Sequence, residues 1–161
     1  MCKLYESSTG PVPTNSMQAK GTIASLKRLA DLITAGVLPE HLSARLEVTF
    51  SKGSGSFPRV PWVAIVPAGK TVSGTPSVAI CFGRTGNGAV AGLMAPAGLT
   101  GGLVTVARSR DSASFVNVDS GKSTAAYNNK FVNPREFAAG TGNWSELRDH
   151  LSRSLKLFGY K

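Results

Sequence analysis

The chain has 161 residues, of which 42% are hydrophobic and 17% are charged, a composition typical of one globular domain and not of a disordered segment. Its two cysteines and two histidines lack metal-binding spacings, and no apolar run reaches the roughly 18 residues of a membrane span. These observations disfavour a disulfide scaffold, a zinc module and a membrane protein. We therefore expect a cytoplasmic protein without a metal or other cofactor.

The net charge of +9 and the pI near 10.0 come mainly from the middle of the chain. Between Arg45 and Arg135 there are ten basic residues and only three acids, whereas most other acids lie in the end segments, interspersed with Lys and Arg. A basic central body of this kind is typical of a polyanion-binding surface. A generically basic protein is the alternative on charge alone.

Residues 1–15 form a polar, proline-bearing stretch that we interpret as a flexible leader, and residues 16–161 are expected to form a single domain. Apolar residues at helical spacing predict a helix from Ser16 to Ala35, ended by Gly36. Four strands joined by glycine-rich turns follow: Leu46–Phe50, Val60–Val66, Ser77–Phe82 and Ala89–Met94.

The later part of the chain is less regular. Three further segments are expected as strands, the last of them alternatively as a short helix: Leu103–Ala107, Ser114–Val118 and Tyr127–Val132. Asn143, followed three residues later by Glu146, predicts the start of a closing helix with one apolar face, ended by Gly159. The expected fold class is α+β, with a small, curved, mostly antiparallel sheet and a helix at each end of the chain packed on it.

No catalytic constellation is found in the sequence. Gly121-Lys122-Ser123 resembles the end of a phosphate-binding loop, but Val116 occupies the position where that motif requires its first glycine. The acids do not cluster with a lysine in a nuclease-like pattern, and His41 and His150 have no Ser or Cys partner in a recognisable motif. We therefore expect a binding domain and not an enzyme.

The stretch "FSKGSGSFPRVPWVAIVP", residues 50–67, combines a basic small-residue loop with a stiff apolar strand. Lys52 and Arg59 flank glycines and serines that allow the backbone to approach a duplex closely, and Trp62 begins the strand. An aromatic face at that position is able to stack a nucleobase. The alternative reading of Trp62 is an ordinary core residue, and that of Phe57 is a buried anchor for the loop.

The glycine loop with Phe57, the Val60-Pro61-Trp62 step and the strand after Gly74 resemble the N-terminal DNA-binding domain of McrB-type modification-dependent (type IV) restriction systems. The similarity is firmest from Ala44 to Leu93. It implies a domain that binds double-stranded DNA and flips a modified cytosine, such as 5-methylcytosine, into a pocket. In that family the domain precedes an AAA+ GTPase motor that recruits a nuclease subunit for phage defence, and this chain would be the recognition module alone.

The resemblance implies three groups of site residues. The expected modified-base pocket consists of Trp62, Pro76, Val78, Ile80 and Phe82, with Val78 or Ile80 against the methyl group. The expected DNA-binding loop consists of Lys52, Gly53, Ser54, Gly55, Ser56, Phe57 and Arg59. Phosphate contacts are expected from Lys70, Arg84, Arg108, Arg110, Lys122 and Lys130.

The loop departs from the family pattern in its length, which is about two residues greater, and at Ser54. Ser54 stands where the family has an aromatic residue that fills the gap left by the flipped base, and Phe57, Arg59 and Lys52 are the candidates for that role here. Two other function classes stay open: a non-specific basic nucleic-acid-binding domain that acts only electrostatically, and a protein-interaction adaptor.

Overall fold

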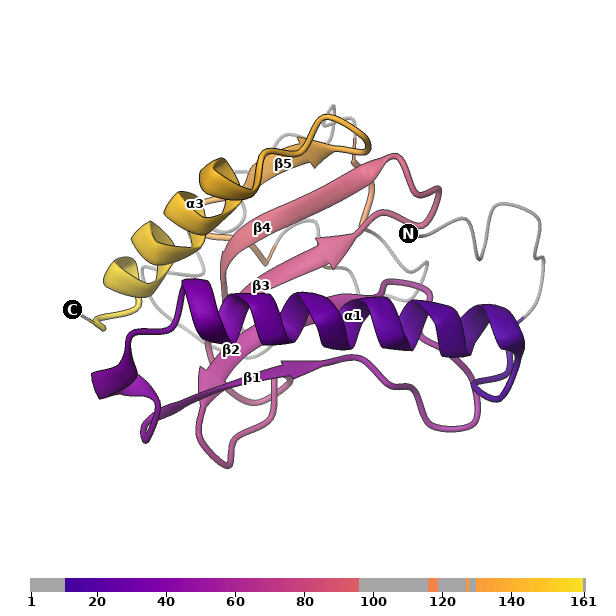
Figure 1. Ribbon diagram of the computed structural model, residues 1–161, viewed down its shortest axis with the longest axis horizontal. Helices are drawn as coiled ribbons and strands as arrows, with labels where there is room; N and C mark the ends of the chain where they lie inside the picture. The colour runs from indigo at the N-terminus through magenta and orange to yellow at the C-terminus, as the bar shows by residue number, and fades with distance from the viewer. Residues whose placement is uncertain (1–10, 96–115, 119–126, 128–129, 161) are drawn as a thin grey trace.

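The computed structural model describes residues 11–95, 116–118, 127 and 130–160, and its centre is a five-stranded antiparallel sheet (Figure 1). The strands are β1 (Leu46–Phe50), β2 (Trp62–Pro67), β3 (Ser77–Phe82), β4 (Gly88–Met94) and β5 (Arg135–Ala138). Their spatial order is their order in the sequence, so the sheet is an open meander. The links from β1 to β4 have at most eleven residues, fewer than the dozen or more of a parallel crossover, so these neighbouring strands pair antiparallel.

Two long helices lie on the same face of the sheet (Figure 1). Helix α1 (Met17–Gly36) packs against β1 and β2, and α3 (Trp144–Leu157) packs against β4 and β3. A short 3₁₀ helix, η1 (Glu40–Leu42), joins α1 to β1. The predicted α+β class, with one helix near each end of the chain, is confirmed. Within the described residues, none of the helices combines the length and apolarity needed to cross a membrane.

Both helices begin where the sequence predicts. The Ser16 Oγ accepts a hydrogen bond from the Ala19 N–H at 3.2 Å, and the Asn143 Oδ1 accepts one from the Ser145 N–H at 2.9 Å. Each cap satisfies a backbone donor that the helix itself leaves unpaired. The Glu146 carboxylate forms an ion pair with Arg135, which ties the first turn of α3 to the neighbouring β5.

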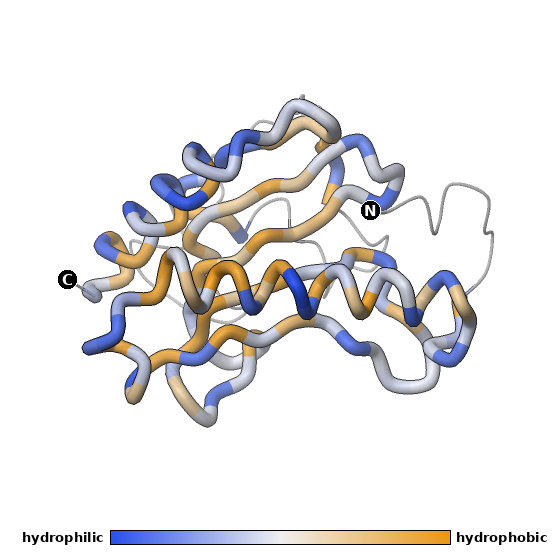
Figure 2. Tube along the Cα trace, viewed as in Figure 1, coloured by the Kyte–Doolittle hydropathy of each residue, from blue (hydrophilic) through white to orange (hydrophobic). Residues whose placement is uncertain are grey.

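The central strands of the sheet, β2 to β4, are buried on both faces. On the helix side, Val63, Ile65, Val78 and Ile80 pack with the apolar faces of α1 and α3. The side chains between them, including Ala64, Val66, Ala79 and Cys81, point to the far face, where Val116, Val118 and Phe131 cover them. Because successive strand residues alternate between two buried faces, β2, β3 and β4 are apolar along much of their length (Figure 2).

Three expectations for the later part of the chain have different outcomes. Strand β5 was not predicted, because its four residues include Arg135 and Glu136 and show no apolar run. Leu103–Ala107 lies outside the described residues, and residues 116–118 of the second expected strand are irregular. In the segment from Tyr127 to Val132, Phe131 forms an isolated β-bridge with Met94.

Gly92 in β4 provides a test of this packing. Its φ is +151°, and a Cβ there would lie 2.6 Å from the carbonyl oxygen of Asn133. We expect Gly92→Ala to lower the free energy of unfolding by about 1–3 kcal/mol. A Cβ at Gly21 in α1 would meet no atom within 4 Å, so Gly21→Ala should raise stability by about 0.5–1 kcal/mol. Urea unfolding checks both, and equal stability of the two variants would contradict the packing.

Candidate functional site

A pocket of about 470 Å³ opens on the far face of the sheet, away from the helices. Strands β1 to β4, the β2–β3 link and the segment around Tyr127 all contribute to it. Its lining residues are Thr49, Trp62, Lys70, Thr71, Val72, Ser73, Ser77, Met94, Ala95, Tyr127 and Lys130. The volume lies within the range of small-ligand sites in proteins. We call it the Trp62 pocket.

Two aromatic side chains line the Trp62 pocket. Trp62 and Tyr127 are both half-buried and pack against the far-face core, so each ring is supported and partly accessible. Burial raises the pKa of the Tyr127 phenol above its usual value near 10.0, and Cys81 raises it further. The phenol therefore stays neutral at physiological pH and keeps its O–H donor. The rings provide the kind of surface on which planar ligands stack.

The charge of the Trp62 pocket is positive. Lys70 is exposed on the β2–β3 link, and the Lys130 Nζ lies 5.1 Å from the centre of the Tyr127 ring. None of the described lining residues is acidic. An anionic ligand or a nucleotide phosphate at the pocket mouth would therefore meet two ammonium groups.

Ser77 contributes a polar group to an otherwise apolar wall. Its side chain is 1% exposed, and its Oγ has no hydrogen-bond partner among the described residues. Leaving a buried hydroxyl unpaired costs about 1–3 kcal/mol. Within the described part of the chain, the Ser77 Oγ is the only buried side-chain oxygen or nitrogen atom without a hydrogen-bond partner.

Two hydrogen bonds with Ser51, one of them to its side chain, hold the backbone of Trp62 at the end of the basic loop. The Ser51 N–H donates to the Trp62 carbonyl, and the Trp62 N–H donates to the Ser51 Oγ, both at 3.0 Å. Ser51 is buried, so water does not compete for these bonds. The loop from residue 52 to residue 61 thus starts and ends beside a residue that lines the pocket.

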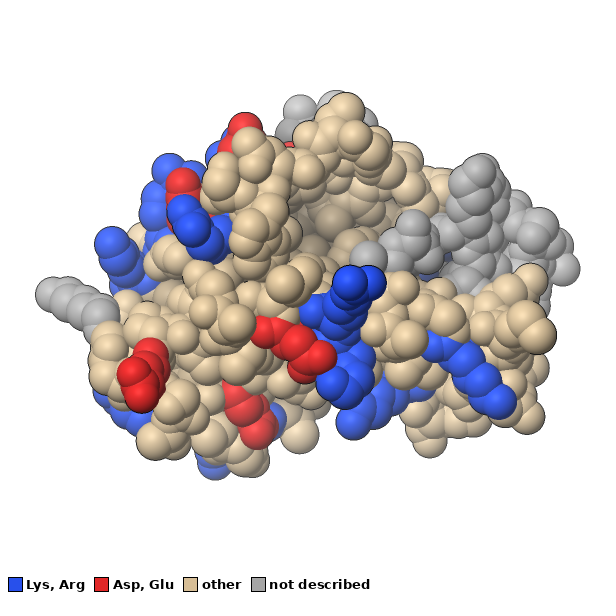
Figure 3. All heavy atoms as spheres, in the orientation of Figure 1, with Lys and Arg blue, Asp and Glu red and all other residues tan. Residues whose placement is uncertain are grey.

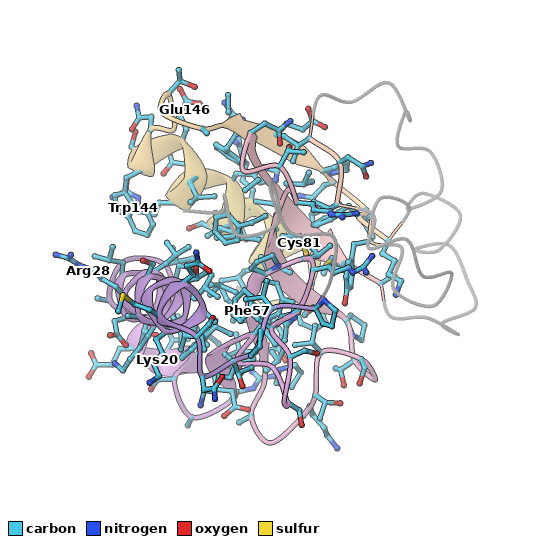
Figure 4. The ribbon with its side chains drawn as sticks, turned by 90° about the vertical axis from the view of Figure 1, so that its right-hand side faces the viewer. Lys20, Arg28, Phe57, Cys81, Trp144 and Glu146 are labelled. Atoms are coloured by element: carbon cyan, nitrogen blue, oxygen red, sulfur yellow. The ribbon has the colours of Figure 1, made fainter. Side chains whose placement is uncertain are left out.

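The structure corrects the prediction that Phe57 contacts DNA. Phe57 is 2% exposed and belongs to the helix-side core, near the centre of the molecule in Figure 4. Its N–H donates to the Val12 carbonyl at 2.8 Å, and the Thr14 N–H donates to the Gly55 carbonyl at 3.1 Å. Phe57 is therefore an internal anchor, since its ring is enclosed by protein and cannot enter a duplex.

The remaining loop residues differ in their exposure. The residues from Lys52 to Ser56 are exposed, whereas Arg59 is half-buried. Gly53 and Gly55 both have φ of +76°, a conformation that favours glycine. The Lys52 Nζ lies 5.2 Å from the centre of the Phe50 ring. The surface that the loop offers to a partner is thus limited to its first half and the Arg59 side chain.

The five residues expected to form the base pocket do not lie together. In the sheet register, Trp62 is opposite Cys81 and Val63 is opposite Ile80, so Trp62 faces away from the helices while Val78, Ile80 and Phe82 face them. The sheet therefore separates Trp62 from these three residues. Pro76 is half-buried at the end of the β2–β3 link and does not line the Trp62 pocket.

Ile80 and Phe82 instead line a second hollow, of about 450 Å³, on the helix side. It lies between α1, the N-terminal end of α3 and the β3–β4 turn, and Figure 3 shows it as a depression. Trp144 is 38% exposed at its edge and points from α3 toward α1 (Figure 4). This hollow is mainly apolar, and none of its lining residues is charged.

The expected phosphate contacts are only partly brought together. Lys70 and Lys130 line the Trp62 pocket, whereas Arg84 is half-buried in the β3–β4 turn and lines neither hollow. Arg108, Arg110 and Lys122 lie outside the described residues.

Sequence reasoning missed Ser77 and Tyr127 as lining residues. No local signal pointed to Ser77, because β3 is buried almost throughout and shows no polar–apolar alternation.

His150 lies in the core. It is buried, and its Nε2 lies 3.0 Å from the carbonyl oxygen of Ala91. Burial lowers the pKa of this imidazole, and the nearby Arg153 and Arg135 lower it further. Among the described residues, no group of three His, Cys, Asp or Glu side chains is arranged to hold a metal ion.

Comparison of the chain with models of known protein families, with curated proteins and with solved structures found no match. The site must therefore be interpreted from its own geometry and chemistry.

The role of Phe57 as an anchor is testable by its effect on stability. Phe57→Ala should lower the free energy of unfolding by about 3–5 kcal/mol, because it removes a large buried side chain. Lys52→Ala, in the exposed half of the same loop, should change stability by less than about 0.5 kcal/mol. Chemical denaturation measures both values. A small effect of Phe57→Ala would show that the ring is not part of the core.

Proposed function

We propose that this domain recognises a modified cytosine, such as 5-methylcytosine, in double-stranded DNA, and that the flipped base enters the Trp62 pocket. The observation that carries the proposal is the position of Trp62, half-buried and lining a cavity together with Tyr127 and two lysines. A sealed, fully buried indole would have no such role. The combination of stacking surfaces with nearby ammonium groups is suited to a nucleotide.

The energetics of base flipping are compatible with this pocket. Flipping costs a few kcal/mol of lost stacking and pairing. Base–aromatic stacking contributes about 1–3 kcal/mol per base, and the aromatic side chains that line the pocket are Trp62 and Tyr127. Val72 and Met94, also in the lining, give apolar contacts for a methyl group and take the role first expected for Val78 or Ile80. An added methyl in an apolar site is worth about 1–3 kcal/mol.

The loop and the Trp62 pocket lie next to each other at one point. Both are therefore able to contact one DNA duplex at the same time. The exposed residues from Lys52 to Ser56 leave the sheet beside the Ser51–Trp62 hydrogen bonds. Small side chains there permit close approach to the DNA backbone, and Lys70 and Lys130 supply charge at the pocket. With Phe57 in the core, Lys52 and Arg59 are the candidates for filling the gap left by the flipped base.

The biological role that we propose is that of the specificity module of a type IV restriction system, acting in the cytoplasm in phage defence. The support is the resemblance of the segment from Ala44 to Leu93 to McrB-type N-terminal domains, together with the pocket behind Trp62. In this role the domain binds DNA and catalyses no reaction. An AAA+ GTPase motor and a nuclease subunit would be its partners.

A second candidate function is non-specific nucleic-acid binding, which the exposed cations outside the pocket favour. Six of them lie on α1 and α3, on the opposite side of the sheet, and several are visible in Figure 3. They are Lys20, Lys27, Arg28, Arg148, Arg153 and Lys156. Two of them, Lys27 and Arg148, form surface ion pairs with Asp31 and Asp149. A purely electrostatic binder would show a steep salt dependence and no preference for a modified base.

Modification preference separates the two functions. In titrations at one fixed salt concentration, we expect the protein to bind a duplex with one 5-methylcytosine at least about tenfold more tightly than the unmodified duplex, as one favourable methyl contact allows. Fluorescence anisotropy measures both affinities. Equal affinity for the unmodified duplex and for duplexes with several different cytosine modifications would contradict the proposal.

The two tryptophans of the chain form a matched pair of variants. Trp62→Ala should abolish the preference for the modified duplex and leave weak, salt-sensitive binding, because phosphate contacts are spread over many cations. Trp144→Ala, which alters the hollow on the other side of the sheet, should leave the preference unchanged. The measurement is the ratio of the two dissociation constants for each variant. If only Trp144→Ala lost the preference, the base would have to bind on the helix side and not in the Trp62 pocket.

A further inference from the structure

We infer that the hydroxyl of Ser77 is the group in the Trp62 pocket that hydrogen-bonds the polar edge of the inserted base. Ser77 would then be a specificity-determining residue, beside the stacking surfaces of Trp62 and Tyr127. The inference rests on the proposed function, because it assigns a role within the same pocket. It concerns a residue for which the sequence predicted no role.

The first argument is the state of the hydroxyl itself. Ser77 is 1% exposed, lines the Trp62 pocket, and its Oγ has no hydrogen-bond partner among the described residues. Two other hydroxyls of the lining, those of Thr71 and Ser73, lie 3.3 Å apart and are on exposed residues. Buried polar groups in folded proteins are normally paired, so an unpaired one in the wall of a cavity points to a ligand atom as its partner.

The second argument is the apolar setting of Ser77. Ala79 and Cys81 follow it on the same face of β3, and Met94 is its partner across the β3–β4 ladder. The Met94 sulfur lies 3.8 Å from the Cys81 Sγ, from which it accepts a weak hydrogen bond. Alanine would suit the folding of this wall at least as well as serine, because the hydroxyl gains no bond within it. The presence of serine is explained by a partner that arrives with the ligand.

The third argument is the chemistry of a flipped base. A base that leaves the duplex loses its Watson–Crick partner, and its amino, ring-nitrogen and carbonyl groups need new ones. Aromatic rings cover only the faces of the base. A serine hydroxyl both donates and accepts, so it is able to bond the carbonyl or ring nitrogen of cytosine, or its amino group. Ser77 thus supplies the edge contact that the two rings lack.

The test combines one substitution with two ligands. Ser77→Ala is titrated with a duplex containing 5-methylcytosine and with the same duplex carrying an abasic site at that position. We expect a loss of affinity on the order of tenfold for the 5-methylcytosine duplex and less than about twofold for the abasic duplex, which has no base edge to bond. Ser25→Ala, on α1, is the matched control and should change neither affinity.

Thermal unfolding gives an independent readout of the same variant. Because Ser77→Ala removes an unpaired buried hydroxyl, its Tm should equal or exceed that of the wild type. An unchanged affinity for the 5-methylcytosine duplex would overturn the inference. A lower Tm with equal losses for both duplexes would also overturn it, because it would indicate a structural role. Failure of the proposed function itself is recognised separately, since the wild-type protein would then show no preference for the modified duplex.

Discussion

The alternation of side chains in a sheet that is buried on both faces is the constraint on which the rest of the structure depends. In β2 and β3, one set of positions packs with α1 and α3, and the other set faces the far side. A shift of one residue in register would carry Trp62 into the helix-side core and bring Val63 to the pocket. The register therefore determines both the stability of the sheet and the identity of the residues that line its cavity.

The glycine- and serine-rich loop is held to the rest of the structure by hydrogen bonds and by one buried side chain. Ser51 and Trp62 join the two ends of the loop, Phe57 enters the core from its middle, and Gly55 accepts a hydrogen bond from Thr14. The loop is attached at three places, and its exposed part is short. A loop attached in this way loses less conformational entropy on binding than an unattached loop of the same composition. The glycines in it serve backbone conformation, as the positive φ of Gly53 shows.

The fold was largely predictable from the sequence, whereas the lining of the site was not. Ser16 and Asn143 mark helix starts by local chemistry, and the apolar runs of β2, β3 and β4 need no long-range information. The face that each strand residue occupies depends on how the link from Pro67 to Pro76 sets the register, which no local signal specifies. Tyr127 and Lys130 meet Trp62 only through the tertiary fold, because more than sixty positions separate them in the sequence.

Buried polar groups are paired on the helix side of the sheet and include an unpaired one on the far side, and this contrast supports the binding face that we propose. On the helix side, the Asn133 Oδ1 accepts from the Leu93 N–H at 2.7 Å, its Nδ2 donates to Ser154, and His150 bonds the Ala91 carbonyl. On the far side, Ser77 is unpaired among the described residues. Interiors shaped only by folding pair their buried polar groups, whereas binding sites keep some of them available for a ligand. The helix side therefore has the character of a folding core. The far side combines an unpaired hydroxyl with accessible rings and lysines, and this is why we propose it as the nucleotide-binding side.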